Sequence, residues 1–288
     1  MESKCFLCPV GCGVVRDEKA GYCGETNRVR IAKYYLHKFE EPVINGKNGS
    51  GTVFFCGCSL KCVFCQNYAL SRSQTGKEVT PKELAEIFGE LENTGATNIN
   101  LVTPTHFAPQ IAEAFEIYRP AIPVVYNTHS YEPVKTLEIL RKYVDIYLPD
   151  LKFCSPDISE RYTGKRNYFS VASEAVKYMA SVKKTEFAQD GTMKSGVIVR
   201  HMVMPLCVED SRKIVGWFAE NLADKAYFSL MAQYTPFGKI EKYPELKRRI
   251  TAREYQRVYE EVLNRGIENY FAQELGSAKE SFIPKWDF

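Results

Sequence analysis

Short apolar runs alternate along the chain with longer segments that have helical spacing. Runs rich in β-branched and aromatic residues predict strands at 51–55, 98–103, 122–127, 144–149, 197–204, 226–233 and 268–274. Segments with apolar residues three and four positions apart predict helices at 80–93, 107–118, 132–142, 171–184, 209–222 and from 251 onward. Two helices also carry start signals, because Thr80 and Thr251 are each followed three residues later by a Glu, the spacing of a capping box.

This alternation predicts the fold class. Strands separated by helices of about 10–15 residues indicate βαβ units and a parallel sheet. Six or seven such units predict an α/β fold, a partial TIM-like barrel of the (β/α)6 type, in which chemistry sits at the carboxyl ends of the strands. Residues 1–45 show no long periodic segment. We therefore predict a small N-terminal extension at 1–45 and a barrel domain at 46–288.

Composition and charge narrow the class of protein. The chain is 45% hydrophobic and 25% charged, as in soluble globular proteins with one large core. Lys plus Arg exceeds Asp plus Glu by only 38 − 35 = 3, so we expect neither nucleic acid nor a membrane as partner. No run approaches the roughly 18 apolar residues of a membrane span, and the N-terminus is polar. The expected location is the cytoplasm.

Three closely spaced cysteines are the most informative feature. The cysteine triplet, Cys58, Cys62 and Cys65, lies within eight residues that follow a predicted strand. Three thiolates can ligate three irons of a 4Fe–4S cluster and leave the fourth iron open. An open iron can bind a ligand that carries an amine and a carboxylate. Two alternatives remain: Cys56 as a fourth ligand that closes the cluster, or zinc at the triplet.

Four more cysteines precede the barrel. The N-terminal tetrad, Cys5, Cys8, Cys12 and Cys23, has enough ligands for a closed metal site. Zinc is our first expectation and a second iron–sulfur cluster the alternative, since spacing alone does not decide between them. The isolated Cys154 and Cys207 are expected to be buried as small hydrophobic residues.

The sequence around the triplet resembles a known signature. GSGTVFFCGCSLKCVFCQN (49–67), with Phe64 just before the third cysteine, is similar to the signature of radical S-adenosylmethionine (SAM) enzymes. Further segments resemble the pyruvate formate-lyase activating enzyme-like branch: HKFEEPVINGKNGSGT (37–52), NLVTPTHFAPQI (100–111), VYNTHSYE (125–132), YLPDLKF (147–153), VRHMVMPL (199–206), LMAQYTPFG (230–238) and NYFAQE (269–274).

The resemblance implies a specific chemistry. The triplet would hold a 4Fe–4S cluster, and SAM would chelate the fourth iron. One electron, from a donor such as flavodoxin or ferredoxin, would cleave SAM to methionine and a 5′-deoxyadenosyl radical that abstracts hydrogen. The implied substrate is a backbone glycine of a partner, a glycyl radical enzyme; a small molecule or a peptide is the alternative. A rival of another class is an electron-transfer or metal-binding protein with closed sites, in which Cys56 is a ligand.

Cofactor contacts carry over position by position. Phe64 matches the aromatic residue beside the adenine of SAM. Thr103-Pro104-Thr105 stands where relatives have Gly-Gly-Glu, which receives the methionine amine, so Thr103 and Thr105 are candidate contacts. Asn127-Thr128 replaces an Asp-Thr pair near the methionine carboxylate, and the lost carboxylate disfavours a bound monovalent cation.

Charged residues at strand ends complete the implied site. Asp150 and Lys152 match an Asp-x-Lys motif, and Lys152 and Arg200 would meet the anionic end of the cofactor. An ordinary ion pair with Asp150 is the other interpretation of these two cations. His129 and His201 are further candidates at predicted strand ends, and Gln273-Glu274 is a candidate for the barrel mouth or for the core.

Overall fold

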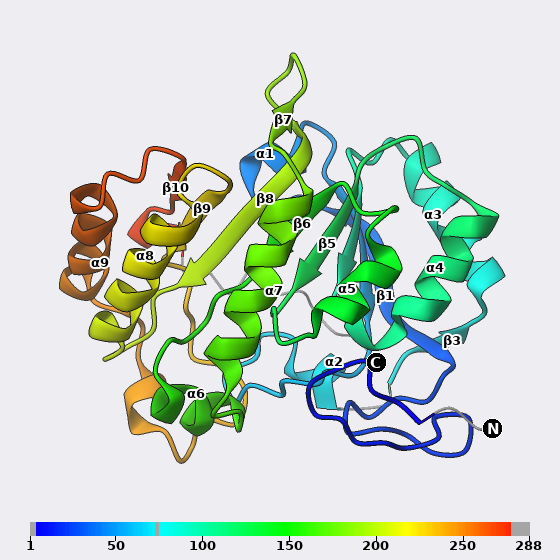
Figure 1. The fold of residues 1–288 in the computed structure, drawn as a ribbon, viewed down its shortest axis with the longest axis horizontal. Helices are drawn as coiled ribbons and strands as arrows, with labels where there is room; N and C mark the ends of the chain where they lie inside the picture. Colours follow the sequence, from blue (N-terminus) through cyan, green and yellow to red (C-terminus); the bar gives the residue numbers. More distant parts are fainter. Residues whose placement is uncertain (1–3, 73–74, 278–288) are drawn as a thin grey trace.

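Seven parallel strands form the centre of an open, curved sheet (Figure 1). The computed structural model describes residues 4–72 and 75–277. Within these ranges the parallel strands are β2 (Ser50–Phe55), β4 (Ile99–Val102), β5 (Val124–Thr128), β6 (Ile146–Pro149), β8 (Met193–Met202), β9 (Tyr227–Met231) and β10 (Tyr270–Ala272). Each strand pairs with the parallel strand before it in the chain, in the order β2-β4-β5-β6-β8-β9-β10. The predicted α/β partial barrel is confirmed, with one parallel strand more than six.

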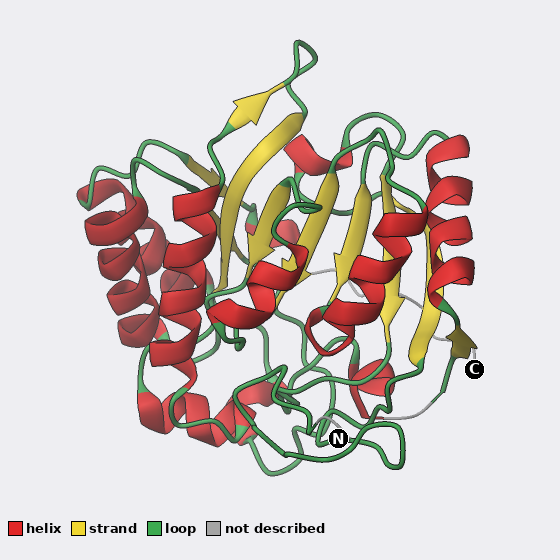
Figure 2. Cartoon of the chain, turned by 45° about the vertical axis from the view of Figure 1, so that its right-hand side comes forward, coloured by secondary structure: helices red, strands yellow, loops and turns green. Residues whose placement is uncertain are grey.

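Helices cover the outer face of this sheet (Figure 2). They are α3 (Pro81–Asn93), α4 (Ala108–Ile117), α5 (Val134–Leu140), α7 (Tyr168–Val182), α8 (Val208–Leu222) and α9 (Ala252–Asn264), and all six were predicted. Both capping boxes are formed, at Thr80 with Glu83 and at Thr251 with Glu254. In the described ranges no helix has the length and apolar content needed to cross a bilayer.

Several short elements were not predicted from the sequence. They are the helices α1 (Pro42–Asn45), α2 (Tyr68–Arg72) and α6 (Pro156–Thr163), the strands β3 (Lys77–Val79) and β7 (Glu186–Phe187), and 3-10 turns at Thr105–Phe107, Pro244–Lys247 and Leu275–Ser277. Strand β7 forms a hairpin with the start of β8. Most of these elements have two to five residues and lack a clear apolar pattern, and the eight-residue α6 buries mainly polar and aromatic side chains, Ser159, Tyr162 and Thr163.

The first strand of the sheet precedes residue 45, the predicted end of the N-terminal extension. Strand β1 (Val29–His37) pairs antiparallel with β2 and with β3, so it belongs to the sheet. Among the described residues, those from 4 to 28 precede this first strand. The strand was missed because it lies towards the edge of the sheet and most of its side chains are only half-buried, which weakens the apolar pattern.

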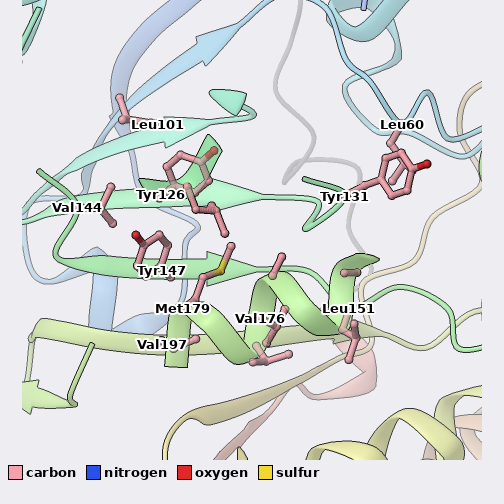
Figure 3. Close-up of a cluster of buried hydrophobic side chains, with 14 of the residues drawn as sticks. Leu60, Leu101, Tyr126, Tyr131, Val144, Tyr147, Leu151, Val176, Met179 and Val197 are labelled. Atoms are coloured by element: carbon pink, nitrogen blue, oxygen red, sulfur yellow. The ribbon is translucent and has the colours of Figure 1, made fainter. Parts of the chain in front are cut away.

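Two apolar layers hold the barrel together. The larger one lies between the sheet and the helices; Figure 3 shows Val176 and Met179 of α7 in the same cluster as the strand residues Tyr126 and Tyr147, whose rings meet edge-on at 5.8 Å. The smaller one lies on the inner face, where Ile44 of α1 packs against Val125, Ile146, Leu148 and Ile198. Helix α1 therefore fills the inside of the barrel and brings the residues just before it into the interior.

Candidate active site

A cavity of about 240 Å³ opens at the carboxyl ends of the parallel strands. This is the end at which a barrel of this kind places its chemistry. Most of the predicted site residues line it: Cys58, Cys62, Phe64, Cys65, Thr103, Asn127, Thr128, Asp150, Lys152 and Arg200, together with the candidate His129. Residues that are far apart in the sequence are thus brought together by the ends of six strands.

The cysteine triplet lies on the loop after β2 and faces this cavity. The backbone of the loop is fixed from outside, because the amide of Val63 donates to the carbonyl of Tyr162 at 2.9 Å. Gly238 packs against the same loop so closely that a β-carbon there would overlap the carbonyl oxygen of Val63. The loop therefore has little freedom to change the spacing of its sulfur atoms.

The surroundings of the triplet suit a metal cluster. Burial raises the pKa of the Cys62 thiol strongly and that of Cys65 to about 11. Burial would also raise the pKa of Cys58, but His129 and two backbone amides lower it to about 7. Buried thiols of this kind become thiolates when a metal supplies positive charge. The donor set therefore fits the cluster that the signature implies.

His129 has a defined tautomer beside the triplet. Its Nδ1 accepts the amide hydrogen of Tyr131 at 3.0 Å, so the ring proton is on Nε2. Nε2 lies 3.2 Å from the hydroxyl of Ser59. A neutral His129 can therefore donate to Ser59 or to the neighbouring sulfur of Cys58.

Cys56 does not belong to this set. Its side chain is fully buried, its thiol donates to the carbonyl of Thr75 at 2.8 Å, and it is not among the residues that line the cavity. Burial raises its pKa to about 12. The structure thus gives no support to Cys56 as a fourth ligand, on which the closed-site rival depends.

An ion-pair network crosses the floor of the cavity. Asp150 accepts from Lys152 at 2.6 Å and from Arg200 at 2.8 Å. Burial would raise the pKa of Asp150, but the two cations lower it below its usual value. Both interpretations of Lys152 and Arg200 hold at once, since they pair with Asp150 and also line the cavity.

Glu40 is a cavity residue that the sequence did not reveal. Its carboxylate accepts from Asn100 at 3.0 Å and from Asn127 at 3.3 Å, and it lies 3.5 Å from a guanidinium nitrogen of Arg200. Glu41 is buried beside it and accepts from Ser229 at 2.7 Å. Two adjacent carboxylates before the apolar segment of α1 were the available signal, but these residues had been assigned to the N-terminal extension.

The two threonines after β4 have different surroundings. Thr103 lines the cavity in the left-handed region, at φ 59°, and its amide donates to the carbonyl of Asn127 at 2.9 Å. A β-branched residue is strained there, and such strain is concentrated at functional sites. Thr105 does not line the cavity; it is buried and accepts from the hydroxyl of Tyr126 at 3.5 Å.

Phe64 lies between the cavity and an aromatic cluster. It lines the cavity and meets the rings of Phe153, Tyr162 and Tyr234 edge-on at 5.8, 6.4 and 6.5 Å. These contacts fix its orientation.

Thr128, the other predicted contact, donates its hydroxyl to Glu132 at 2.6 Å.

The remaining candidates do not line the cavity. His201 is buried, with Nδ1 2.7 Å from the carbonyl of Leu151, and it is not a lining residue. Gln273 donates to Gln233 at 3.2 Å, and Gln233 lines the cavity, so Gln273 supports the site without entering it. Glu274 is not among the lining residues either.

Neither cysteine group surrounds the position of a single ion. In the part of the chain that the structure describes, no three His, Cys, Asp or Glu side chains are arranged to hold one metal ion. An iron–sulfur cluster binds each thiolate to a different iron, so it spaces its cysteines more widely than one zinc ion does.

Comparisons with known proteins agree with this geometry. Residues 52–205 match the protein family described as the Radical SAM superfamily. The chain is 33% identical over 272 residues to an uncharacterised protein of Methanocaldococcus jannaschii, MJ0674, and the match covers 89% of this chain and 73% of that protein.

Solved structures show the same fold. SuiB of Streptococcus suis bound to S-adenosylmethionine is similar with a TM-score of 0.55 and 19% identity, over 77% of this chain and 49% of SuiB. A radical SAM methyltransferase of Sphaerobacter thermophilus has a TM-score of 0.50 and 14% identity, over 78% of this chain and 66% of that protein. This chain thus spans about half the length of SuiB.

Proposed function

This chain belongs to the radical SAM superfamily, and we propose that it uses SAM to generate a glycyl radical on a partner enzyme. The superfamily implies a 4Fe–4S cluster and SAM as cofactors. When bound, they supply an electron and a 5′-deoxyadenosyl radical that abstracts hydrogen. The observation that carries the proposal is the cysteine triplet, which shares one cavity with the ion-pair network at the strand ends.

The residues of the cavity have separable tasks in this proposal. The triplet would hold three irons of the cluster. Asn127, Asp150 and Arg200 present a fixed set of donors and acceptors to the methionine part of SAM, because each is already hydrogen-bonded to another member of the network. Such preorganisation lowers the cost of ordering the site when the cofactor binds.

The rim of the cavity supports a protein as substrate. Two exposed apolar side chains lie at or beside it: Phe39, 56% exposed, lines the cavity, and Phe237, 36% exposed, precedes the glycine that packs against the triplet loop. Large apolar side chains gathered at a cavity mouth are typical of a surface that contacts another polypeptide. A sheet that is not closed between β3 and β10 leaves room for an inserted loop.

The test is a radical transfer experiment. The anaerobically reconstituted protein is mixed with SAM, a reductant and a glycyl radical enzyme encoded by the same genome. We expect a stable glycyl radical signal in electron paramagnetic resonance, which is lost when Cys58 is replaced by alanine. Formation of 5′-deoxyadenosine without any protein radical would contradict the glycyl target and favour a peptide or small-molecule substrate. SuiB, whose structure has also been solved with its precursor peptide, is a neighbour in fold with such a substrate.

A further inference from the structure

The N-terminal tetrad comes together on one small unit outside the cavity. The unit spans residues 4–28 and lies beyond the carboxyl ends of the strands, next to α2, in both views (Figures 1 and 2). A short antiparallel bridge joins Lys4 to Val15 and folds the segment back on itself. A β-carbon at Gly21 would lie 3.4 Å from the sulfur of Cys12 and 3.6 Å from the sulfur of Cys23. These two sulfurs thus face the same glycine.

Backbone amides are directed at the sulfur atoms of the tetrad. The amides of Val10 and Gly11 hydrogen-bond the sulfur of Cys8, and those of Val14 and Tyr22 the sulfur of Cys12. Amide donors stabilise a thiolate over a thiol. The fold of this unit is thus suited to four thiolates, which are the ligands of zinc and of iron–sulfur clusters.

A buried cation next to the tetrad has no carboxylate partner. Arg16 is 2% exposed, and its guanidinium donates to the carbonyls of Glu25, Thr26 and His106. Among the residues that the structure describes, none forms a salt bridge with it. The nearby carboxylate of Glu25 is instead paired with Arg30 at 3.2 Å.

Arg16 lies beside the tetrad. It shares an acceptor with Cys23, because the carbonyl of Glu25 accepts from Nε of Arg16 at 3.3 Å and from the thiol of Cys23 at 3.9 Å. A buried cation without an anion is strongly unfavourable. Four thiolates around a zinc ion or around a 4Fe–4S cluster carry a net negative charge, which would be the missing counter-charge.

The same unit is joined to the triplet. The carbonyl of Cys23 accepts the amide hydrogen of Cys58 at 3.1 Å, so a ligand of one group is hydrogen-bonded to a ligand of the other. Between them, Gly57 has a φ of 79°, and a β-carbon there would lie 2.8 Å from the same Cys23 oxygen. Tyr22 adds a second contact, with its ring 4.4 Å from the Nζ of Lys61 in the triplet loop.

From these contacts we infer that the N-terminal tetrad binds an iron–sulfur cluster, because its sulfurs are not gathered around the position of one ion, and that this centre fixes the Cys58 end of the triplet loop. One zinc ion is the alternative that the metal analysis distinguishes. Arg16 supplies its counter-charge and ties the unit to the barrel through the carbonyl of His106. The inference goes beyond the proposed function and does not depend on the substrate.

The metal is tested in a variant that lacks the cavity site. In a chain with Cys58, Cys62 and Cys65 all replaced by alanine, stoichiometric zinc or iron can only belong to the tetrad. We expect about one zinc ion, or the iron of one cluster, per chain after reconstitution with zinc or with iron and sulfide. Which of the two is retained identifies the centre. Cys8→Ser and Cys23→Ser added to this variant should abolish binding, whereas Cys207→Ser, a buried control, should not.

A spectroscopic titration tests the tetrad without substituting it, so the result does not depend on whether Cys8→Ser or Cys23→Ser folds. Cobalt(II) added to the same triple-alanine chain, with its own tetrad intact, should give the intense near-ultraviolet absorption of thiolate bound to cobalt. No such band, together with no stoichiometric zinc or iron, would overturn the inference. Neither result bears on the proposed function, because the cavity site is absent from this chain.

The effect of the N-terminal tetrad on the cysteine triplet is measured separately, by the iron content and the spectrum of the cavity cluster. With the triplet intact, Cys8→Ser should lower the iron retained by the cavity cluster and weaken the change that SAM causes in its electron paramagnetic resonance spectrum. Cys207→Ser should leave both unchanged. If Cys8→Ser keeps the full iron content and the full spectral response, the tetrad does not position the triplet loop.

Discussion

At the scale of single residues, the cavity depends on a buried set of charges that balance one another. Asp150 is shared by Lys152 and Arg200, and Arg200 also reaches Asn127 at 2.7 Å and Glu40 at 3.5 Å. Removing one partner from such a buried set leaves the others uncompensated. Arg200 is the member with the most partners, so it is the most sensitive position.

We predict that Arg200→Met lowers the free energy of unfolding by about 3 kcal/mol, the cost of breaking a buried ion pair from one side. Arg166→Met is the matched control, because Arg166 pairs with Asp157 and Glu160 in solvent. Urea unfolding of the cluster-free protein measures both. Equal stability of the two variants would show that the network is not tightly coupled.

A second residue-scale prediction concerns Glu254, the N3 residue of α9. Hydrogen bonds from Arg248 lower its pKa to about 2, with the capping box and the amide of Leu206 contributing. A lowered pKa stabilises the fold above the unfolded value of 4.5, and the effect is lost as the pH falls towards 2.

We therefore expect Glu254→Gln to lower the free energy of unfolding by about 1–2 kcal/mol at neutral pH, allowing for solvent screening. Urea unfolding at pH 7 and near pH 3 measures the difference between wild type and variant, which should shrink at the lower pH. A difference that stays constant with pH would contradict this account of the cap.

At the scale of elements, the loop after β2 is held in place by contacts on two sides, from the barrel and from the N-terminal unit. Gly238 and Tyr162 contact Val63 from the barrel side, and Cys23 contacts Cys58 from the N-terminal unit. The spacing of the triplet is therefore imposed by the surrounding elements as well as by its own sequence.

Gly238→Ala tests whether contact with Val63 fixes the triplet loop. Its β-carbon would overlap the carbonyl of Val63, so the loop must shift, and we expect clearly less iron per chain after reconstitution. Gly266→Ala is the control, because Gly266 also has a positive φ but no atom within 4 Å of its β-carbon. The control should cost about 1 kcal/mol of stability and keep its iron. If both variants retain full iron, contact with Gly238 does not fix the loop.

The elements also show what sequence patterns can and cannot reveal. The six helices on the outer face and the seven parallel strands followed from apolar periodicity, because each buries a continuous face. Strand β1 did not, since its side chains are mostly half-buried, and Glu40 was missed with it because it follows that strand. Similarly, the sequence could not separate Thr103 from Thr105, because two threonines two positions apart after the same strand show no difference in pattern, while in the fold Thr103 lines the cavity and Thr105 is buried away from it.

At the scale of the whole molecule, one end of the barrel collects the chemistry. Six strand ends, the triplet loop and the N-terminal unit meet there, while α1 fills the inner face. The position of this end could be predicted from the parallel sheet alone. Whether Cys56 closes the cluster could not be predicted, because Cys56 and Cys58 are only two positions apart in the sequence. The fold separates them, since the thiol of Cys56 is buried and that of Cys58 faces the cavity.

The most direct test of the central claim is the yield of 5′-deoxyadenosine from anaerobically reconstituted protein with SAM and a reductant. We predict that Cys56→Ala retains most of the wild-type yield, since its thiol donates to the carbonyl of Thr75 and does not line the cavity, and that Cys58→Ala loses it. Loss of activity in Cys56→Ala with activity retained in Cys58→Ala would contradict a cluster held by the triplet with one open iron.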